Sequence, residues 1–269
     1  MRILLFIPCL ADQFAPRAAE ATALLLEHLG CEVIYPEGQT CCGQAHRNSG
    51  DEEAARALVL RMAEIFEGDE LIVTPSGSCA AMITQHALGL FGAATPVPAN
   101  VQSLVQRTRE LVQFIEQDLG LAPDEIVGGP GTAASVVAWH PSCHLRELNR
   151  FQASGRFLES IPGLAVKRLR QEEQCCGFGG TFASKFGAIS GALAEDRCAA
   201  LEESCAPVLL CNDTGCTMNI EGRLSRRGTP IQIQHVAEWF CQALGLQSSD
   251  EGSKDERSKD QRSKDQGNS

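Results

Sequence analysis

Long hydrophobic runs are missing from this 269-residue sequence. Its longest apolar runs, such as residues 3–7 and 208–211, have the length of a β-strand, whereas a membrane-spanning helix needs about 20 apolar residues. The opening segment MRILLFIPCLAD contains one basic residue, a very short apolar core and no small-residue cleavage site, so it does not resemble a secretion signal. We therefore expect a cytoplasmic protein that does not span a membrane.

Positive charge and cofactor-binding motifs are scarce as well. The chain has 23 lysines and arginines against 34 aspartates and glutamates, a net charge of −11, which argues against nucleic acid as the main partner. No P-loop occurs, and Gly177, Gly179 and Gly180 do not form a GxGxxG motif between a strand and a helix. Without a flavin or nicotinamide motif, the chain is not expected to carry out hydride chemistry by itself.

Cysteine, by contrast, occurs thirteen times, an odd number. In a cytoplasmic protein disulfides are disfavoured, and clustered cysteines more often bind metal or carry out redox chemistry. A lone cysteine is usually a small buried hydrophobic residue. Five cysteines have no counterpart in the other half of the chain, and we expect each of them to be a buried thiol. One of them, Cys211, is near enough to Cys216 to be a spare ligand. These five are Cys31, Cys198, Cys205, Cys211 and Cys241.

The chain repeats itself around two Cys-Cys-Gly units, at residues 41–43 and 175–177. The same interval of 32 positions separates Cys9 from Cys41 and Cys143 from Cys175. Cys79 and Cys216 then follow the second cysteine of each pair by 37 and 40 positions, and the segments ELVQFIEQDLGL and HVAEWFCQALGL are also alike. We therefore expect two homologous domains at residues 1–121 and 135–246, a linker at 122–134, and a disordered charged tail at 247–269.

Each unit alternates between strand-like and helix-like segments. Helical periodicity covers residues 17–29 and 51–66 in the first unit. Short apolar segments predict strands at residues 2–7, 31–35, 70–74, 135–139, 164–169, 207–211 and 230–234. This alternation is typical of α/β proteins, so we expect two Rossmann-like domains, each a small parallel sheet flanked by helices. Every repeated cysteine follows the carboxyl end of a strand, where such sheets bind ligands, so each unit is expected to bring four thiols together.

Four converging thiolates can hold zinc or an iron–sulfur cluster. The two C-x2-C pairs of structural zinc sites are missing, and so is the C-x2-C-x2-C run of ferredoxin-type clusters. Adjacent cysteines suit a cluster better than a single ion, because neighbouring side chains diverge. The glycine after each pair allows close backbone approach and a positive φ. The spacing favours iron–sulfur over zinc or a thiol-only redox centre, which both stay open.

Several motifs carry a resemblance to a known family. They are PCLADQF, QTCCGQAHRNSG, PSGSCAAM, HPSCHLRE, CCGFGGTFASKFGAIS and HVAEW. With them, residues 3–246 resemble the CCG or cysteine-rich domain family of iron–sulfur oxidoreductases, which includes a subunit of heterodisulfide reductase and the iron–sulfur subunits of glycolate oxidase and anaerobic glycerol-3-phosphate dehydrogenase. The chain looks most like the lactate utilization protein A branch. We expect no N-terminal ferredoxin-like module of the kind that the glycolate and glycerol-phosphate subunits carry.

The resemblance implies two iron–sulfur clusters, one in each domain. Heterodisulfide reductase ends each motif in C-x-x-C, but here Ser76 and Asp213 replace the first of those cysteines. Four cysteines per unit fit an ordinary [4Fe–4S] cluster. The expected ligands are Cys9, Cys41, Cys42 and Cys79 for the first cluster, and Cys143, Cys175, Cys176 and Cys216 for the second.

Polar residues near these cysteines have two interpretations each. His140 and His144 flank Cys143, and they are either hydrogen-bond donors that tune the cluster or ordinary polar residues at a strand end. Asp213 is either an oxygen ligand or hydrogen-bond partner of the cluster, or the N-cap of a helix. Other candidates for holding a partner or a substrate carboxylate are His46, Asn48 and Lys185, and His235 is expected at a strand-to-helix corner.

The resemblance implies an electron-transfer subunit of a multi-subunit oxidoreductase that converts L-lactate to pyruvate. Its implied partners are two other lactate utilization proteins, one of them a larger iron–sulfur protein, and the chain is not expected to be active alone. Three alternatives stay open. They are a heterodisulfide-reductase-like subunit that reduces a disulfide or quinone, a subunit of a glycolate or other 2-hydroxy-acid oxidase, and a zinc-bound scaffold.

Overall fold

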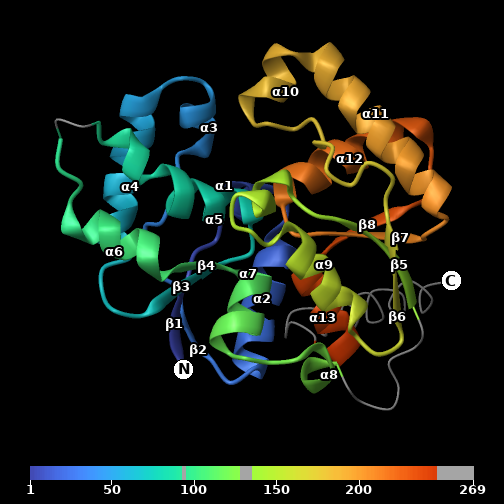
Figure 1. The fold of residues 1–269 in the computed structure, drawn as a ribbon, viewed down its shortest axis with the longest axis horizontal. Helices are drawn as coiled ribbons and strands as arrows, with labels where there is room; N and C mark the ends of the chain where they lie inside the picture. Colours follow the sequence, from blue (N-terminus) through green and yellow to red (C-terminus); the bar gives the residue numbers. More distant parts are fainter. Residues whose placement is uncertain (93–94, 128–134, 247–269) are drawn as a thin grey trace, which may run out of the picture.

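The computed structural model describes residues 1–92, 95–127 and 135–246 (Figure 1). The tail predicted at residues 247–269 lies outside the described residues, as do residues 128–134 of the predicted linker. No helix in the described part of the chain is long and apolar enough to cross a membrane.

Each half of the chain contains a four-stranded parallel sheet. The first sheet has the order β2-β1-β3-β4 and the second has the matching order β6-β5-β7-β8. This confirms the prediction of two homologous Rossmann-like α/β domains. The strands are β1 (Arg2–Leu5), β2 (Glu32–Ile34), β3 (Leu71–Thr74), β4 (Thr108–Glu110), β5 (Ser135–His140), β6 (Leu164–Arg168), β7 (Val208–Cys211) and β8 (Gln232–His235).

Helices connect these strands in the order that the repeat predicts. In the first half they are α1 (Cys9–Phe14), α2 (Pro16–His28), α3 (Gln44–Asn48), α4 (Glu52–Ile65), α5 (Gly77–Ala81), η1 (Met82–His86), η2 (Leu88–Leu90), α6 (Ala99–Arg107), α7 (Leu111–Gln113), η3 (Phe114–Asp118) and α8 (Pro123–Ile126). In the second half they are η4 (Cys143–Arg146), α9 (Phe151–Glu159), α10 (Thr181–Lys185), α11 (Gly187–Ser204), α12 (Thr214–Arg227) and α13 (Val236–Leu244).

Local signals explain where the two predicted helices begin. Pro16 occupies the first turn of α2, where its missing N–H costs nothing. Asp51 caps α4 by accepting a hydrogen bond from the backbone N–H of Ala54, and two glutamates follow in the first turn. The observed bounds of both helices therefore lie within a residue of the predicted ones.

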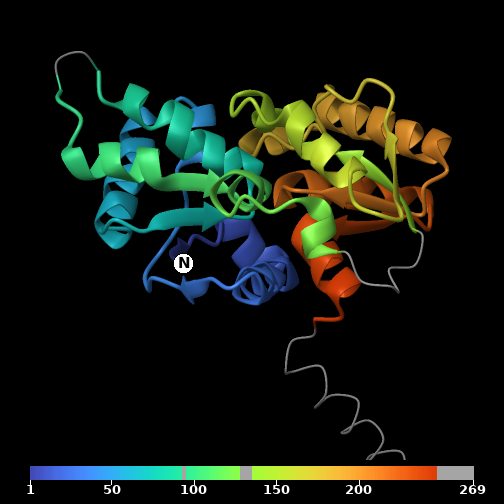
Figure 2. The ribbon, with the colours of Figure 1, turned by 60° about the horizontal axis from the view of Figure 1, so that its bottom comes forward.

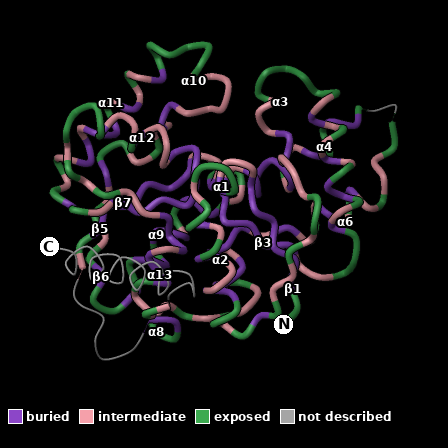
Figure 3. The backbone as a smooth tube through the Cα atoms, turned by 180° about the vertical axis from the view of Figure 1, so that it is seen from behind, coloured by how far each residue is buried: buried purple, intermediate pink, exposed green. Residues whose placement is uncertain are grey.

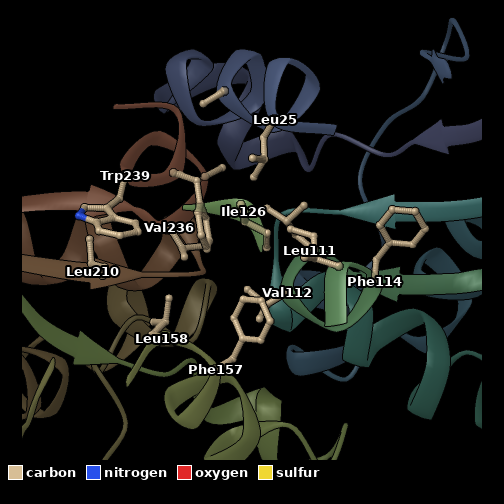
Figure 4. Close-up of a cluster of buried hydrophobic side chains, with 14 of the residues drawn as sticks. Leu25, Leu111, Val112, Phe114, Ile126, Phe157, Leu158, Leu210, Val236 and Trp239 are labelled. Atoms are coloured by element: carbon tan, nitrogen blue, oxygen red, sulfur yellow. The ribbon is translucent and has the colours of Figure 1, made fainter. Parts of the chain in front are cut away.

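One hydrophobic core joins the two halves. Leu25 of α2, Val112 of α7, Phe157 of α9 and Trp239 of α13 belong to the same buried cluster (Figure 4). Helix α2 of the first half packs against α13 of the second, and the Cys241 thiol donates a hydrogen bond to the carbonyl of Ala21 at 3.2 Å. Figure 2 shows the blue α2 and the red α13 side by side below the two lobes. This shared core fixes the two sheets relative to each other.

Candidate metal centre

The repeated cysteines all follow the carboxyl ends of strands, and the two adjacent pairs lie further along the chain from their strands than the other four do. Cys9 follows β1 and is the first residue of α1, while Cys79 is the third residue of α5, which follows β3. The second half repeats this placement, with Cys143 opening η4 and Cys216 third in α12. Short helices begin almost at the strand ends, so these four cysteines lie in the first turns of helices. The two adjacent pairs do lie in non-helical segments.

The cysteines of each half converge, and they do so in the same way. In the first half the Sγ atoms of Cys42 and Cys79 lie 3.2 Å apart, and the backbone N–H of Gly43 donates to the Cys41 Sγ at 3.4 Å. The corresponding distances in the second half are 2.9 Å between Cys176 and Cys216, and 3.3 Å from the Gly177 nitrogen to the Cys175 Sγ. Each half therefore builds one compact thiol set.

The glycine of each Cys-Cys-Gly unit is required by its backbone. Gly43 has a φ of 90° and Gly177 a φ of 86°, a region that other residues rarely adopt. A Cβ atom would lie 3.1 Å from the carbonyl oxygen of Ala55 at position 43, and 2.6 Å from that of Ser190 at position 177. The positive φ agrees with the sequence prediction, and these turns direct the glycine N–H at a cysteine sulfur.

The thiols of each set cannot all ionise unaided. In the first set, hydrogen bonds from Cys42 and Cys9 lower the pKa of Cys41. The same hydrogen bonds to Cys41 are the largest cause of the raised pKa of Cys9 and of the raised pKa of Cys42. In the second set, hydrogen bonds from Cys143 and Cys176 lower the pKa of Cys175. One thiolate thus suppresses ionisation of its neighbours, and a bound cation removes this penalty. The donor chemistry fits a thiolate-bound metal or iron–sulfur centre.

Both thiol sets line a single cavity of ≈ 380 Å³. All eight repeated cysteines contribute to its wall, and no lysine or arginine among the described residues does. On one side the wall comes from α3 and α10, which contain no buried residue (Figure 3) and are linked by a 2.8 Å hydrogen bond between Ser49 Oγ and Thr181 Oγ1. The sequence predicted two sites but gave no indication that they face each other.

Asp213 acts as the N-cap of α12, one of the two roles predicted for it. Its Oδ1 accepts a hydrogen bond from the Gly215 nitrogen at 3.1 Å, and its Oδ2 accepts from Ser76 Oγ at 3.0 Å and from the Ser78 nitrogen at 3.1 Å. Both carboxylate oxygens are therefore occupied by protein donors at the wall of the cavity.

The two histidines beside Cys143 differ in their surroundings. His144 lines the cavity, with its Nε2 2.8 Å from Gln44 Nε2 of the first half and its Nδ1 3.7 Å from the Cys143 Sγ. His140 is buried at the end of β5, and a ring nitrogen, the Cys176 Sγ and the Cys216 Sγ lie within 4.8 Å of one another. Burial lowers the pKa of His140 to about 4.

The other candidates are dispersed. His46 is paired with Asp51 at the surface at 3.3 Å, and Lys185 is exposed at the end of α10, while Asn48 lines the cavity. His235 lies at the predicted corner, capping α13 and bonded through Nε2 to the carbonyl of Pro75 at 2.8 Å. Among the five additional cysteines, only Cys205 is exposed, contrary to the prediction of a buried thiol there.

Sequence reasoning missed Asn212, which joins the two halves beside the cavity. Its Oδ1 accepts from the Ser142 nitrogen at 3.0 Å, its Nδ2 donates to Glu110 Oε1 at 3.3 Å, and its carbonyl accepts from the Gly77 nitrogen at 3.3 Å. Burial raises the pKa of Glu110. The only sequence signal was position, since Asn212 follows a strand end between Cys211 and Asp213.

Fold and site together define a cysteine-rich α/β protein of two repeated units. The family model for CCG, the cysteine-rich domain, matches residues 3–84 and 137–221, and the chain belongs to this family. This confirms the resemblance that the sequence motifs carried. The clustered cysteines of such a domain indicate metal or iron–sulfur binding.

Relatives named lactate utilization protein A match most of the chain. Those from Bacillus licheniformis and Geobacillus sp. (strain WCH70) are each 41% identical over 239 residues, which cover 88% of this chain and 98% of the relative. That from Macrococcus caseolyticus is 40% identical over 239 residues, with 88% and 95% covered.

A solved structure shares the fold. The crystal structure of a hypothetical protein from Helicobacter pylori matches with a TM-score of 0.60 at 13% identity. The match covers 93% of this chain and 50% of that protein, so this chain corresponds to about half of it. At this identity the likeness extends to the fold alone.

Proposed function

We propose that this protein is a cytoplasmic iron–sulfur electron-transfer subunit of a multi-subunit enzyme that oxidises L-lactate to pyruvate. The observation that carries the proposal is the pair of four-cysteine sets facing one cavity. The name of the 40–41% identical relatives, lactate utilization protein A, supplies the substrate. The domain boundaries we propose are residues 1–121 and 135–246.

Each set would hold one [4Fe–4S] cluster through its four thiolates. The ligands would be Cys9, Cys41, Cys42 and Cys79 in the first domain, and Cys143, Cys175, Cys176 and Cys216 in the second. Such a cluster supplies one-electron redox chemistry when bound. The chain's own contribution is to provide the thiolates, to aim the N–H groups of Gly43 and Gly177 at sulfur, and to hold both centres against one cavity.

Hydroxy-acid chemistry would belong to a partner protein. No lysine or arginine of the described chain lines the cavity, so a substrate carboxylate would find neither of these two side chains to pair with there. The sequence also has no flavin or nicotinamide motif to accept a hydride. We therefore assign this chain to electron transfer, in company with two other lactate utilization proteins that include a larger iron–sulfur protein, and expect no lactate oxidation by the chain alone.

The first test is the composition of protein purified without oxygen. Two four-iron clusters predict about eight iron and eight sulfide per chain, with broad absorption near 400 nm. Cys42→Ser and Cys176→Ser should each lose about half of the iron and sulfide, because the ligand sets are separate. Cys205→Ser, which removes an exposed thiol outside both sets, is the matched control and should lose none. Zinc without sulfide would overturn the proposal.

The second test addresses the substrate. The loaded chain is combined with the two other lactate utilization proteins, and reduction of an artificial electron acceptor is followed with L-lactate or glycolate. Activity with lactate that requires this chain, and that Cys42→Ser abolishes, supports the proposal. Activity with glycolate but not with L-lactate would assign the chain to a different 2-hydroxy-acid oxidase.

A second candidate is reduction of a disulfide or quinone at the cavity, which the exposure of both thiol sets to one space favours. The hydrogen-bonded pair of Ser76 and Asp213, which stands where heterodisulfide reductase has its fifth cysteines, weighs against it. Turnover of a disulfide or quinone by the isolated loaded chain would establish this alternative in place of the first.

A further inference from the structure

His140 is a buried polar side chain with no hydrogen-bond partner in the described part of the protein. It is the last residue of β5 and only 1% exposed, and neither Nδ1 nor Nε2 has a donor or acceptor within reach. Buried polar groups in folded proteins almost always have a partner, so one that lacks it needs an explanation.

The sulfur atoms of the second thiol set are the groups that His140 faces. A ring nitrogen, the Cys176 Sγ and the Cys216 Sγ lie within 4.8 Å of one another. The side chain is held there by β5, whose neighbours β6 and β7 pair with it in register on both sides, His140 lying opposite Cys211. The backbone that carries the imidazole is therefore fixed, and burial of the side chain keeps water from serving as its partner.

The first thiol set has no such donor at the matching position. Cys143 corresponds to Cys9 in the repeat, so His140 corresponds to Phe6, three positions before Cys9. Phe6 is fully buried, and its ring packs edge-on against Phe66 with centroids 5.7 Å apart. A phenyl ring cannot donate a hydrogen bond. The two sites are thus built alike in their repeated thiols, and this position is one at which the surroundings of the two sets differ.

We propose that His140 donates an N–H···S hydrogen bond to the second centre and thereby gives it a higher reduction potential than the first. This inference rests on the proposed function, since it requires an iron–sulfur cluster at each set. Hydrogen bonds to cluster sulfur stabilise the reduced, more negative state. His140 is a donor and not a ligand, because the four thiolates of the second set already provide one ligand for each iron. The second centre is therefore the first to be reduced.

The test is a redox titration of the loaded full-length chain, followed by electron paramagnetic resonance, with iron content measured on the same samples. His140→Phe places at position 140 the residue that stands at position 6, and it should lower one of the two midpoint potentials at unchanged iron content. His140→Gln keeps an N–H donor and should recover part of the shift. Phe6→Leu changes the matched position without adding or removing a donor, and should change neither potential. Cys42→Ser, expected to keep the second centre alone, assigns the shifted potential.

The outcomes distinguish a failure of the His140 hydrogen bond from a failure of the proposed electron-transfer function. A wild-type chain without iron and sulfide would overturn both. Two clusters with potentials unchanged by His140→Phe would overturn the inference alone. A loss of about half of the iron in His140→Phe would identify His140 as a ligand and overturn its role as donor. If His140→Gln had a potential as low as that of His140→Phe, the shift would be due to packing, and the role of His140 as a donor would again be overturned.

Discussion

Ser76 and Asp213 occupy equivalent positions in the two halves of the repeat, and they are hydrogen-bonded to each other, with Ser76 Oγ donating to Asp213 Oδ2 at 3.0 Å. Each residue also caps its own cysteine-bearing helix. Ser76 accepts from the backbone nitrogen of Cys79, and Asp213 from that of Gly215. The contact therefore ties the α5 and α12 N-termini, and with them one cysteine of each thiol set, into one buried unit.

Loss of the Asp213 carboxylate is expected to loosen both centres together. Asp213→Ala removes three hydrogen bonds to one charged group, and should cost about 2 kcal/mol or more of stability. We expect both clusters to lose iron to a chelator faster than in the wild type, measured by the decay of visible absorption. Glu125→Ala removes the carboxylate that accepts a hydrogen bond from the Ala122 nitrogen at the start of α8, whose residues do not line the cavity, and serves as the control. If the second centre alone became labile, the contact between the halves would not support the first.

Gly177→Ala should disrupt the second centre through a steric clash. The added Cβ would meet the backbone oxygen of Ser190 at 2.6 Å, which a real Cβ does not tolerate. Gly50 has a similar φ of 81° but open space around the added atom, so Gly50→Ala costs only the left-handed conformation, about 1–2 kcal/mol. We expect about half of the iron to be lost in Gly177→Ala and none in Gly50→Ala. Equal iron content in the two variants would show that the turn yields to the new side chain.

Thiol labelling should distinguish the cluster ligands from the remaining cysteines. Cys205 is the one exposed thiol of the described chain, whereas Cys9, Cys41, Cys143 and Cys175 are partly exposed at the cavity. In the loaded protein an alkylating reagent should label Cys205 alone, because ligands are shielded by the bound metal. After iron is removed by a chelator, these four partly exposed thiols should be labelled as well, as read by mass spectrometry of peptides. Rapid labelling of Cys9 or Cys143 in the loaded protein would exclude that residue as a ligand.

The convergence of four thiols in each half was predictable, because the carboxyl ends of parallel strands share one edge of a sheet. Strand β4 was not, since its three residues Thr108–Glu110 include no apolar run and their extended form depends on pairing with β3. The shared cavity and the contact of Ser76 with Asp213 were missed for a related reason. Both depend on packing between helices α2 and α13, which are far apart in the sequence. No local sequence pattern encodes a contact of this kind.

That packing leads to a prediction about unfolding. Met62 is fully buried in a cluster confined to the first half, whereas both tryptophans, Trp139 and Trp239, lie in the second half. If the shared core couples the halves, Met62→Ala, with an expected cost of about 2–5 kcal/mol, should lower the denaturant midpoint reported by tryptophan fluorescence.

Leu88→Ala is the control for this coupling, because Leu88 is 41% exposed and its loss leaves little cavity. The wild type should show one transition by fluorescence and by circular dichroism, and Met62→Ala should shift both curves by the same amount. If Met62→Ala left the fluorescence midpoint unchanged but lowered the dichroism midpoint, the second half would stay folded at denaturant concentrations that unfold the first half. The common core would then not couple unfolding of the first half, where Met62 lies, to unfolding of the second half, where both tryptophans lie. In that case the polar contacts at the cavity, and not the core, would hold the two centres together.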